Sequence, residues 1–402
     1  MNNVNSEYGS CIEKLTSSIR QLESWVEERH YRGYEPFDGL SSVLRPFTFK
    51  NLFLERLLQQ LVRQCPINIR PVLGVRRNES TKGRGYMAWG YLTLFPHMGE
   101  SKYLEKAESC LEWLQENKSP FYEDLSWGNH FDFSSRGGKL PKLEPIIVWT
   151  SLIGQVCHDA FELTGKEVYL NMAVSIAKWI LSLPRERTDR GDCLSYVMYE
   201  QSSIHNSNML GAAMLARTAG VLQDSNMMEV AKSAMGYSCN SQLETGAWRY
   251  GEKEMHHWVD NFHTGYNLDS LKCYIDHSGD NTWAPNLKAG FEFFVQNFFE
   301  SDGTPKYYDD RTYPIDIQCA SQAITTLALF ANIDIRALPQ AVKVAEWTID
   351  NMQQTDGSFI YRIYPWGRAK TPMLHWGQAT MFKGLSQLLT RVMDTEKRSL
   401  VK

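Results

Sequence analysis

Two kinds of helical pattern alternate along the chain. In the first kind, apolar or small residues recur at i, i+3, i+4 and i+7, which predicts helices with one face in water. These segments are residues 103–118, 169–183, 227–242, 287–300 and 341–354. The second kind is apolar or small around most of the circumference, which predicts helices that are buried on all sides. These segments are residues 86–95, 146–163, 208–222, 264–275, 317–331 and 377–390.

The buried pattern repeats at a nearly constant interval, with starts near residues 86, 148, 205, 263, 316 and 376. The interval of about 58 residues is that of a helical hairpin. With a sixth outer helix drawn from residues 11–28 or 47–64, six hairpins can close into a double ring. We therefore predict an all-α, single-domain (α/α)6 toroid over residues 31–395, preceded by an N-terminal helix and arm over residues 1–30. An open α-solenoid is the alternative.

The connections between the predicted helices differ in length. Buried helices end in short turns at residues 162–165 and 276–279, both of which contain Gly. The outer helices lead into long aromatic segments at residues 119–133, 242–254, 300–316 and 353–367. Because long loops on a rigid scaffold often carry function, we expect the working face at the starts of the buried helices.

Polar side chains gather at these helix starts in greater number than helix capping requires. We predict acid/base roles for Asp260, His263, Asp316 and His205, because a carboxylate and an imidazole can exchange protons near neutral pH. We predict ligand-binding roles for Arg84, Trp127, Asn129, His130, Asn206, Asn208, Trp248, Arg249, Asn261, Tyr313, Gln318, His375, Trp376 and Gln378. Each of these residues also has a structural alternative, as a helix cap or as part of the core.

Composition excludes several classes of partner. The 402 residues carry a net charge of -4, so there is no global basic field to hold nucleic acid or an anionic membrane. Eight scattered cysteines predict neither a disulfide framework nor a zinc site.

Asp269, Cys273 and His277 are spaced like metal ligands, but their helix is expected to be buried. We expect a cytoplasmic protein without metal, cofactor or membrane span, because no signal peptide, phosphate-binding loop or long apolar run occurs.

Three sets of motifs resemble known families. The segments HNSNMLGAAML (205–215) and FHTGYNLDSL (262–271) resemble inner helices of glucuronyl epimerases and of (α/α)6-toroid proteins of bacterial exopolysaccharide biosynthesis, across roughly residues 30–390. HWGQATMFKGLSQLL (375–389) is similar to a helix of the unsaturated glucuronyl hydrolases, although Trp376 stands where that motif has Arg. QLETGAW (242–248) and QQTDGSF (353–359) resemble a motif of squalene-cyclase and prenyltransferase toroids, whose DxDD acid is reduced here to Asp316 alone.

The first resemblance implies a protein that acts on a carbohydrate ligand in cell-surface polysaccharide biosynthesis or turnover. Acid/base chemistry by a hydrolase, a lyase or an epimerase would each suit the predicted residues. A terpenoid enzyme and a non-catalytic glycan-binding protein are the alternatives. The sequence does not fix the substrate, the reaction or the oligomeric state.

Overall fold

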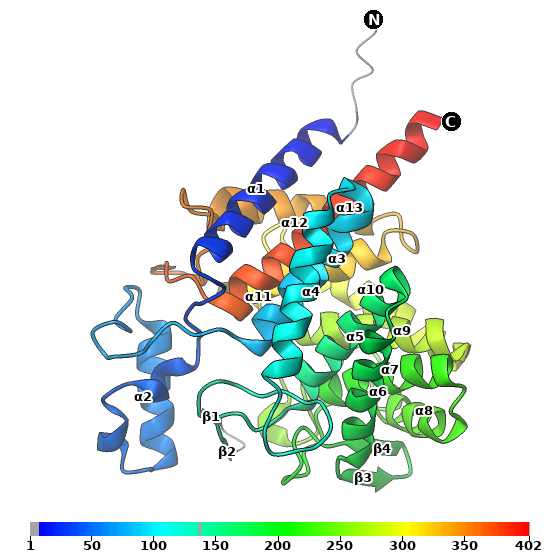
Figure 1. Ribbon diagram of the computed structural model, residues 1–402, viewed down its shortest axis with the longest axis horizontal. Helices are drawn as coiled ribbons and strands as arrows, with labels where there is room; N and C mark the ends of the chain where they lie inside the picture. The colour runs from blue at the N-terminus through cyan, green and yellow to red at the C-terminus, as the bar shows by residue number, and fades with distance from the viewer. Residues whose placement is uncertain (1–7, 136–137, 402) are drawn as a thin grey trace, which may run out of the picture.

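Six inner helices form the centre of the molecule in the computed structural model, which describes residues 8–135 and 138–401 (Figure 1). They are α3 (Thr81–Met98), α5 (Ile147–Thr164), α7 (His205–Leu222), α9 (Asn261–Ser278), α11 (Ile317–Phe330) and α13 (Thr380–Val401). Each inner helix contacts the next, and α13 contacts α3. The ring is therefore closed, which confirms the predicted (α/α)6 toroid and excludes the open solenoid.

Six outer helices surround this ring. They are α1 (Gly9–Glu28), α4 (Ser101–Glu116), α6 (Glu167–Ser182), α8 (Ser225–Cys239), α10 (Ala284–Asn297) and α12 (Ala337–Met352). Helix α1 packs on α12 and α13 and buries Leu15, Ile19, Leu22 and Val26. The toroid thus begins at α1, whereas the sequence analysis placed residues 1–30 before it. Residues 1–7 of that predicted arm lie outside the described residues.

The long connections all lie at the N-terminal ends of the inner helices, as predicted. They carry two antiparallel hairpins, β1 (Phe133–Ser135) with β2 (Gly138–Leu140) and β3 (Arg185–Thr188) with β4 (Gly191–Leu194). They also carry a three-stranded sheet of β5 (Ile315–Asp316), β6 (Arg362–Tyr364) and β7 (Gly367–Ala369). Inner helices α3, α5 and α9 end in short turns at a glycine with positive φ. Short turns and long loops thus lie on opposite faces of the ring.

The Gln–Gly–aromatic motif of residues 242–248 has a structural role in this chain. The Gln242 side-chain amide donates to the carbonyl of Gly246 at 2.8 Å and to a backbone carbonyl of α10 at 3.0 Å. Gly246 has a φ of +89°, and a Cβ there would lie 2.4 Å from the carbonyl oxygen of Ala289. The indole of Trp248 donates to a carbonyl near the end of α8. The motif therefore joins neighbouring outer helices, and its presence does not require terpenoid chemistry.

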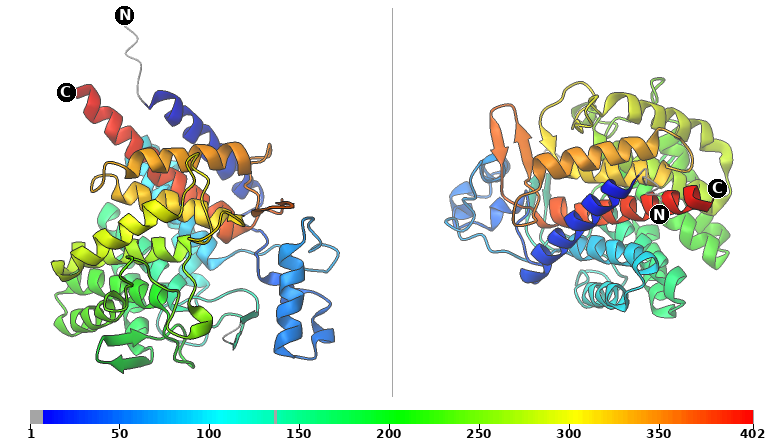
Figure 2. Two further views of the ribbon diagram at one scale, coloured as in Figure 1. Left: turned by 180° about the vertical axis from the view of Figure 1, so that it is seen from behind. Right: turned by 90° about the horizontal axis from the view of Figure 1, so that it is seen from above.

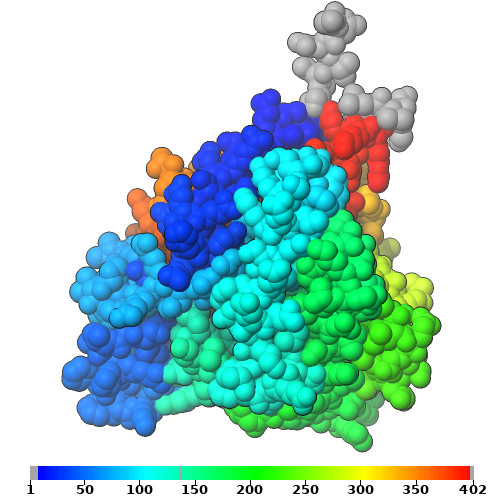
Figure 3. Space-filling model, in the orientation of Figure 1, coloured from blue at the N-terminus to red at the C-terminus, as the bar shows by residue number. Residues whose placement is uncertain are grey.

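Residues 31–80, which connect α1 to α3 in the chain, form a lobe that projects beside the ring (Figures 1 and 3). It holds the short helices η1 (Asp38–Ser41) and η2 (Arg45–Thr48) and the helix α2 (Leu52–Gln64). Helix α2 packs on η1, η2 and β1, and both views of Figure 2 place it outside the double ring. Of the two predicted candidates for the sixth outer helix, α1 therefore takes that position and α2 does not.

Candidate active site at the N-terminal mouth of the toroid

Side chains from the lobe and from three inner-helix starts meet at the N-terminal ends of the inner helices. We call this group the mouth cluster, and it consists of Glu35, Lys82, Asp260, His263, Tyr266 and His375. The closed ring brings these six together from positions as far apart as 340 residues.

His375 is held by a buried carboxylate. Its Nδ1 lies 2.8 Å from Oε1 of Glu35 and 3.0 Å from Oγ of Ser80. Its backbone N–H also donates to Oε1 of Glu35, at 2.9 Å. Burial raises the pKa of Glu35 to about 7 and lowers the pKa of His375 well below its usual range. Burial therefore favours an uncharged pair that shares one proton.

His263 is held by a second carboxylate, which also caps its helix. The Nδ1 of His263 lies 2.7 Å from Oδ2 of Asp260, and Oδ1 of Asp260 accepts the backbone N–H of His263 at 3.0 Å. Asp260 is buried, whereas the His263 side chain keeps 19% of its surface exposed. Among the described residues, Nε2 of His263 has no hydrogen-bond partner. The carboxylate thus orients the imidazole and leaves its other nitrogen available.

Aromatic rings connect the two histidines. The Phe262 ring centroid lies 3.9 Å from that of His263 and 5.6 Å from that of Trp376. The ring of Trp149 lies 5.4 Å from His375. Trp149 and Trp376 are partly exposed. His130 lies near Glu35 and His375, and burial lowers its pKa to about 4.

A layer of phenol, amide and amine groups lies beneath the aromatic rings. The hydroxyl of Tyr266 lies 2.9 Å from the hydroxyl of Tyr86 and accepts from Gln318 Nε2, also at 2.9 Å. The Nζ of Lys82 donates to the same hydroxyl at 3.4 Å. Burial lowers the pKa of Lys82 to about 7. A lysine and a glutamate that both titrate near neutral pH are typical of a functional site.

Asp316 lies beside the mouth, but its carboxylate is fully engaged. It accepts the backbone N–H of Gln318 at 2.8 Å and the indole N–H of Trp376 at 2.9 Å, and it pairs with the buried guanidinium of Arg362. These contacts tie α11 to β6 and to the start of the last inner helix. The predicted acid/base group therefore serves in the structure as an anchor for Trp376.

Comparisons with known proteins bear on the fold alone. No family model matches the sequence, and no curated protein matches it. Cellobiose 2-epimerase from Bacillus thermoamylovorans B4167 superposes with a TM-score of 0.59 at 9% identity, covering 79% of this chain and 88% of that chain. A GH76 α-mannanase from Bacteroides thetaiotaomicron gives 0.59 at 12% identity, with 80% and 88% covered. A D-mannose isomerase gives 0.57 at 12% identity, with 79% and 87% covered.

The chain shares the (α/α)6-toroid fold of these three proteins. The structure thereby confirms a fold related to the one that the sequence resemblance implied. These matches are too distant in sequence to assign roles to residues of this chain.

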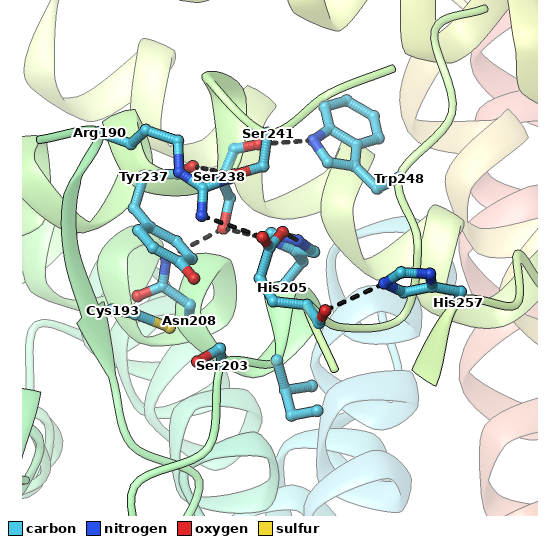
Figure 4. A network of polar contacts seen from close by, with 12 residues as sticks. Arg190, Cys193, Ser203, His205, Asn208, Tyr237, Ser238, Ser241, Trp248 and His257 are labelled. Carbon is cyan, nitrogen blue, oxygen red and sulfur yellow. Dashed lines mark hydrogen bonds and ion pairs between the residues drawn. The ribbon is translucent and has the colours of Figure 1, made fainter. Parts of the chain in front are cut away.

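His205 and Asn208 belong to a network on the outer side of α7 and not to the mouth (Figure 4). The Nδ1 of His205 lies 3.2 Å from Oγ of Ser238, and its Nε2 lies 2.9 Å from Oε1 of Glu252. Asn208 donates to Ser238 Oγ at 3.0 Å. Arg190 completes the network through Glu252, at 2.9 Å. Because both ring nitrogens of His205 are engaged toward α8, the predicted catalytic role has no geometric support.

Several other predicted ligand-binding residues are also directed away from the mouth. Trp127 and Trp248 are buried, and each indole donates to a carbonyl in the last turn of an outer helix. Arg84 pairs with Glu79 at the outer side of α3. Gln378 exchanges hydrogen bonds with the backbone of residue 359. These residues hold loops in place, which corrects their predicted contact with ligand.

The remaining predicted residues occupy three kinds of position. Asn129, Asn206 and Asn261 are buried at the helix-start face, and the amide groups of Asn206 and Asn261 have side-chain atoms that find no hydrogen-bond partner within the described part of the chain. Arg249 and Tyr313 are exposed. The structure brings together Asp260, His263, Gln318, His375 and Trp376 at the mouth, with His130 beside them. Their binding role stays a prediction.

Sequence reasoning missed three members of the mouth cluster. Tyr266 lies within a predicted buried helix, where an aromatic residue is ordinary core. Lys82 lies in the first turn of an inner helix, two residues before the predicted Arg84, and a buried lysine there is a signal that could have been used. Glu35 lies in the lobe, far in sequence from every residue that it contacts in the cluster. Its neighbours give no pattern that distinguishes it from a surface acid.

A second feature lies at the opposite end of the ring. A cavity of about 440 Å³ opens between the C-terminal halves of the inner helices and reaches Tyr266. Asp269 and Lys383 line it, and burial raises the pKa of Asp269 to about 6 and lowers that of Lys383 to about 8. Cys273 and His277 also line it, but no group of three potential ligands in the described ranges could hold a metal ion. The mouth cluster, which has the two oriented imidazoles, is the stronger candidate for chemistry.

Proposed function

We propose that the protein is a sugar epimerase or aldose–ketose isomerase whose acid/base groups are His263 and His375. The observation that carries the proposal is that each imidazole has its Nδ1 within hydrogen-bond distance of a carboxyl group, at one shared mouth. Such a contact orients the ring and leaves Nε2 to exchange a proton with the sugar. The tautomer is inferred from these contacts.

The proposed reaction starts from the open-chain sugar. One imidazole takes the proton from the carbon next to the carbonyl group, and the electron pair moves to the carbonyl oxygen to give an enediolate. The second imidazole then returns a proton to the opposite face of that carbon, which gives the epimer. Return of the proton to the former carbonyl carbon, with transfer of the hydroxyl proton, gives the ketose instead. In this proposal Lys82 and Tyr266 donate to the enediolate oxygen.

Glycoside hydrolysis is the second candidate, since one toroid of the same fold is a mannanase. Hydrolysis requires two carboxyl groups on either side of the glycosidic bond. The carboxylates of Asp260 and Asp316 are already engaged by neighbouring donors. Their engagement favours proton transfer by the two imidazoles over hydrolysis by two carboxyl groups. The sequence resemblance supports a further proposal, that the sugar belongs to cell-surface polysaccharide metabolism in the cytoplasm.

A deuterium-exchange experiment tests the reaction class. The protein is incubated in D₂O with a panel of aldoses, 2-ketoses and reducing disaccharides, and the products are followed by NMR. We expect loss of the C2 proton signal together with a new epimer or ketose, without cleavage of the disaccharides. Cleavage without deuterium at C2 would instead support a hydrolase. Binding of a saccharide that stays intact and unexchanged would support a glycan-binding protein.

A further inference from the structure

The helix α2 exposes its apolar face and buries polar groups. Phe53, Leu57 and Leu61, at i, i+4 and i+8, are 68%, 45% and 60% exposed. The buried face carries Glu55 and Gln59, which bind β1 and its surroundings. A helix of a globular protein normally has the opposite arrangement. The apolar face of α2 is thus available for contact with something outside the described chain.

The apolar surface continues beyond the helix. Phe47 is 70% exposed and Phe49 is 81% exposed, both on the turn that leads into α2, and Ile67 is 70% exposed on the segment that follows it. Together with Phe53, Leu57 and Leu61 these residues form what we call the lobe patch. Exposed apolar patches of this kind mark interaction surfaces, because single exposed apolar residues are usually scattered.

The charge of the lobe is opposite to that of the whole chain. The lobe, residues 31–80, contains eight Lys and Arg residues and four acidic residues, whereas the chain has a net charge of -4. Glu35, Asp38 and Glu55 are buried, and Glu55 pairs with Lys139. Lys50, Arg76 and Arg77 are exposed. The lobe therefore carries exposed basic residues although the whole chain is negative, and one of them, Lys50, directly follows Phe49 of the lobe patch.

We propose that the lobe docks on the surface of an anionic membrane. Aromatic and aliphatic side chains with adjacent Lys and Arg are the combination that binds the interface of anionic lipid bilayers. The rings of Phe47, Phe49 and Phe53 enter the headgroup region, and the basic residues pair with lipid phosphates. A second copy of the chain fits this surface less well, because a symmetric contact would place two basic lobes against each other.

The docking is peripheral and independent of the reaction at the mouth. No helix in the described part of the chain is long and apolar enough to cross a membrane. Phe37 connects the lobe to the mouth, with its ring 5.7 Å from that of Trp376. A docked lobe would therefore hold the mouth of the toroid close to the lipid surface.

Vesicle flotation of the full chain tests the proposal. The probes are vesicles of phosphatidylcholine alone and of phosphatidylcholine mixed equally with phosphatidylglycerol. We expect binding to the anionic vesicles alone, weakened by added NaCl. Phe49→Ser combined with Phe53→Ser should lower partitioning at least about tenfold, as should Lys50→Gln with Arg76→Gln and Arg77→Gln. The matched control is Ile335→Ser, which changes a residue that is 91% exposed on the α11–α12 turn.

Three results would overturn the proposal. They are failure to bind anionic vesicles, equal binding to both vesicle types, and unchanged binding by the Phe49→Ser/Phe53→Ser variant. Dimers that this variant disperses, seen by analytical ultracentrifugation without any vesicle binding, would assign the patch to a second copy. Retention of an acidic protein without vesicle binding would assign it to a protein partner. Should the Phe variant fail to fold, the charge variant and the salt dependence still decide the outcome.

Discussion

The imidazole of His375 and the carboxylate of Glu35 meet at 2.8 Å although 340 residues separate them. Closure of the ring produces this contact, because the last inner helix returns to the first, where the lobe ends. The mouth cluster is consequently complete only when the toroid is closed. A change that opens the ring would therefore also separate the residues of the site.

Replacing His263 should remove most of the proposed activity. We expect His263→Gln to lower kcat for C2 proton exchange by about 10²- to 10⁴-fold, the usual contribution of a general acid or base. The control is His257→Gln, which changes an exposed histidine six residues earlier in the chain and should leave the exchange rate unaltered. Equal losses in the two variants, or none in His263→Gln, would remove His263 from the mechanism.

Asp260→Asn tests positioning and not proton transfer. The amide preserves the shape of the helix cap but cannot hold the Nδ1–H of His263 as a carboxylate does. We expect a fall in kcat with little change in KM, because the imidazole is less well oriented. A fall in stability with unchanged kcat would instead give Asp260 the role of a cap alone.

Glu35 should make folding stability depend on pH. Burial raises its pKa to about 7 in the folded protein, so the folded state binds a proton that the unfolded state has released between about pH 4.5 and 7. Stability therefore falls as the pH rises through this window. Glu35→Gln should abolish that slope and gain about 3 kcal/mol relative to wild type at pH 8. Urea unfolding at about pH 5 and about pH 8 measures the difference, and equal slopes would contradict it.

Lys82 should show the opposite dependence. Burial lowers its pKa to about 7, so the unfolded state binds more protons between about pH 7 and 10.5. The cost of burying the charge is present in full below pH 7 and disappears as the pH rises to 10.5. We expect Lys82→Met to stabilise the protein by several kcal/mol near pH 6, with the gain shrinking at alkaline pH, while sugar turnover falls. A gain in stability that is independent of pH would show that burial does not lower the pKa of the Lys82 amine.

Gly246 should tolerate no side chain. Its φ is +89°, and an added Cβ would lie 2.4 Å from a carbonyl oxygen of α10. Gly279 also has a positive φ but has open space around its Cβ position. Its replacement by Ala therefore measures the cost of the backbone conformation without a steric clash. We expect Gly279→Ala to cost about 1 kcal/mol and Gly246→Ala at least about 2 kcal/mol more. Thermal unfolding measures both, and equal costs would show that the α10 backbone yields.

Most of the fold could be predicted from the sequence. The alternation of one-sided and all-round apolar patterns identified each of the five later outer helices and the inner set, because a helix's periodicity directly reports which of its faces are buried. The pattern could not choose between α1 and α2 as the sixth outer helix. Both segments are amphipathic, and only the packing on α12 and α13 distinguishes the helix whose apolar face is covered.

The candidate site could be predicted only in part. The sequence placed His263, His375 and their neighbours at the correct end of the ring, since helix starts follow from the periodicity. It also placed His205 there, although that side chain is directed toward α8. The rotation of a side chain about its helix axis depends on packing, and spacing within one helix start does not fix it.

The sequence by itself determined that six buried helices alternate with outer helices and that the long loops precede the buried ones, because these are local and periodic properties. The tertiary structure decided which polar groups meet. Glu35 and Lys82 joined the histidines through ring closure, and the apolar face of α2 stayed exposed because its polar face found partners in β1. Contacts between distant segments depend on chain geometry in three dimensions, which no single stretch of sequence encodes.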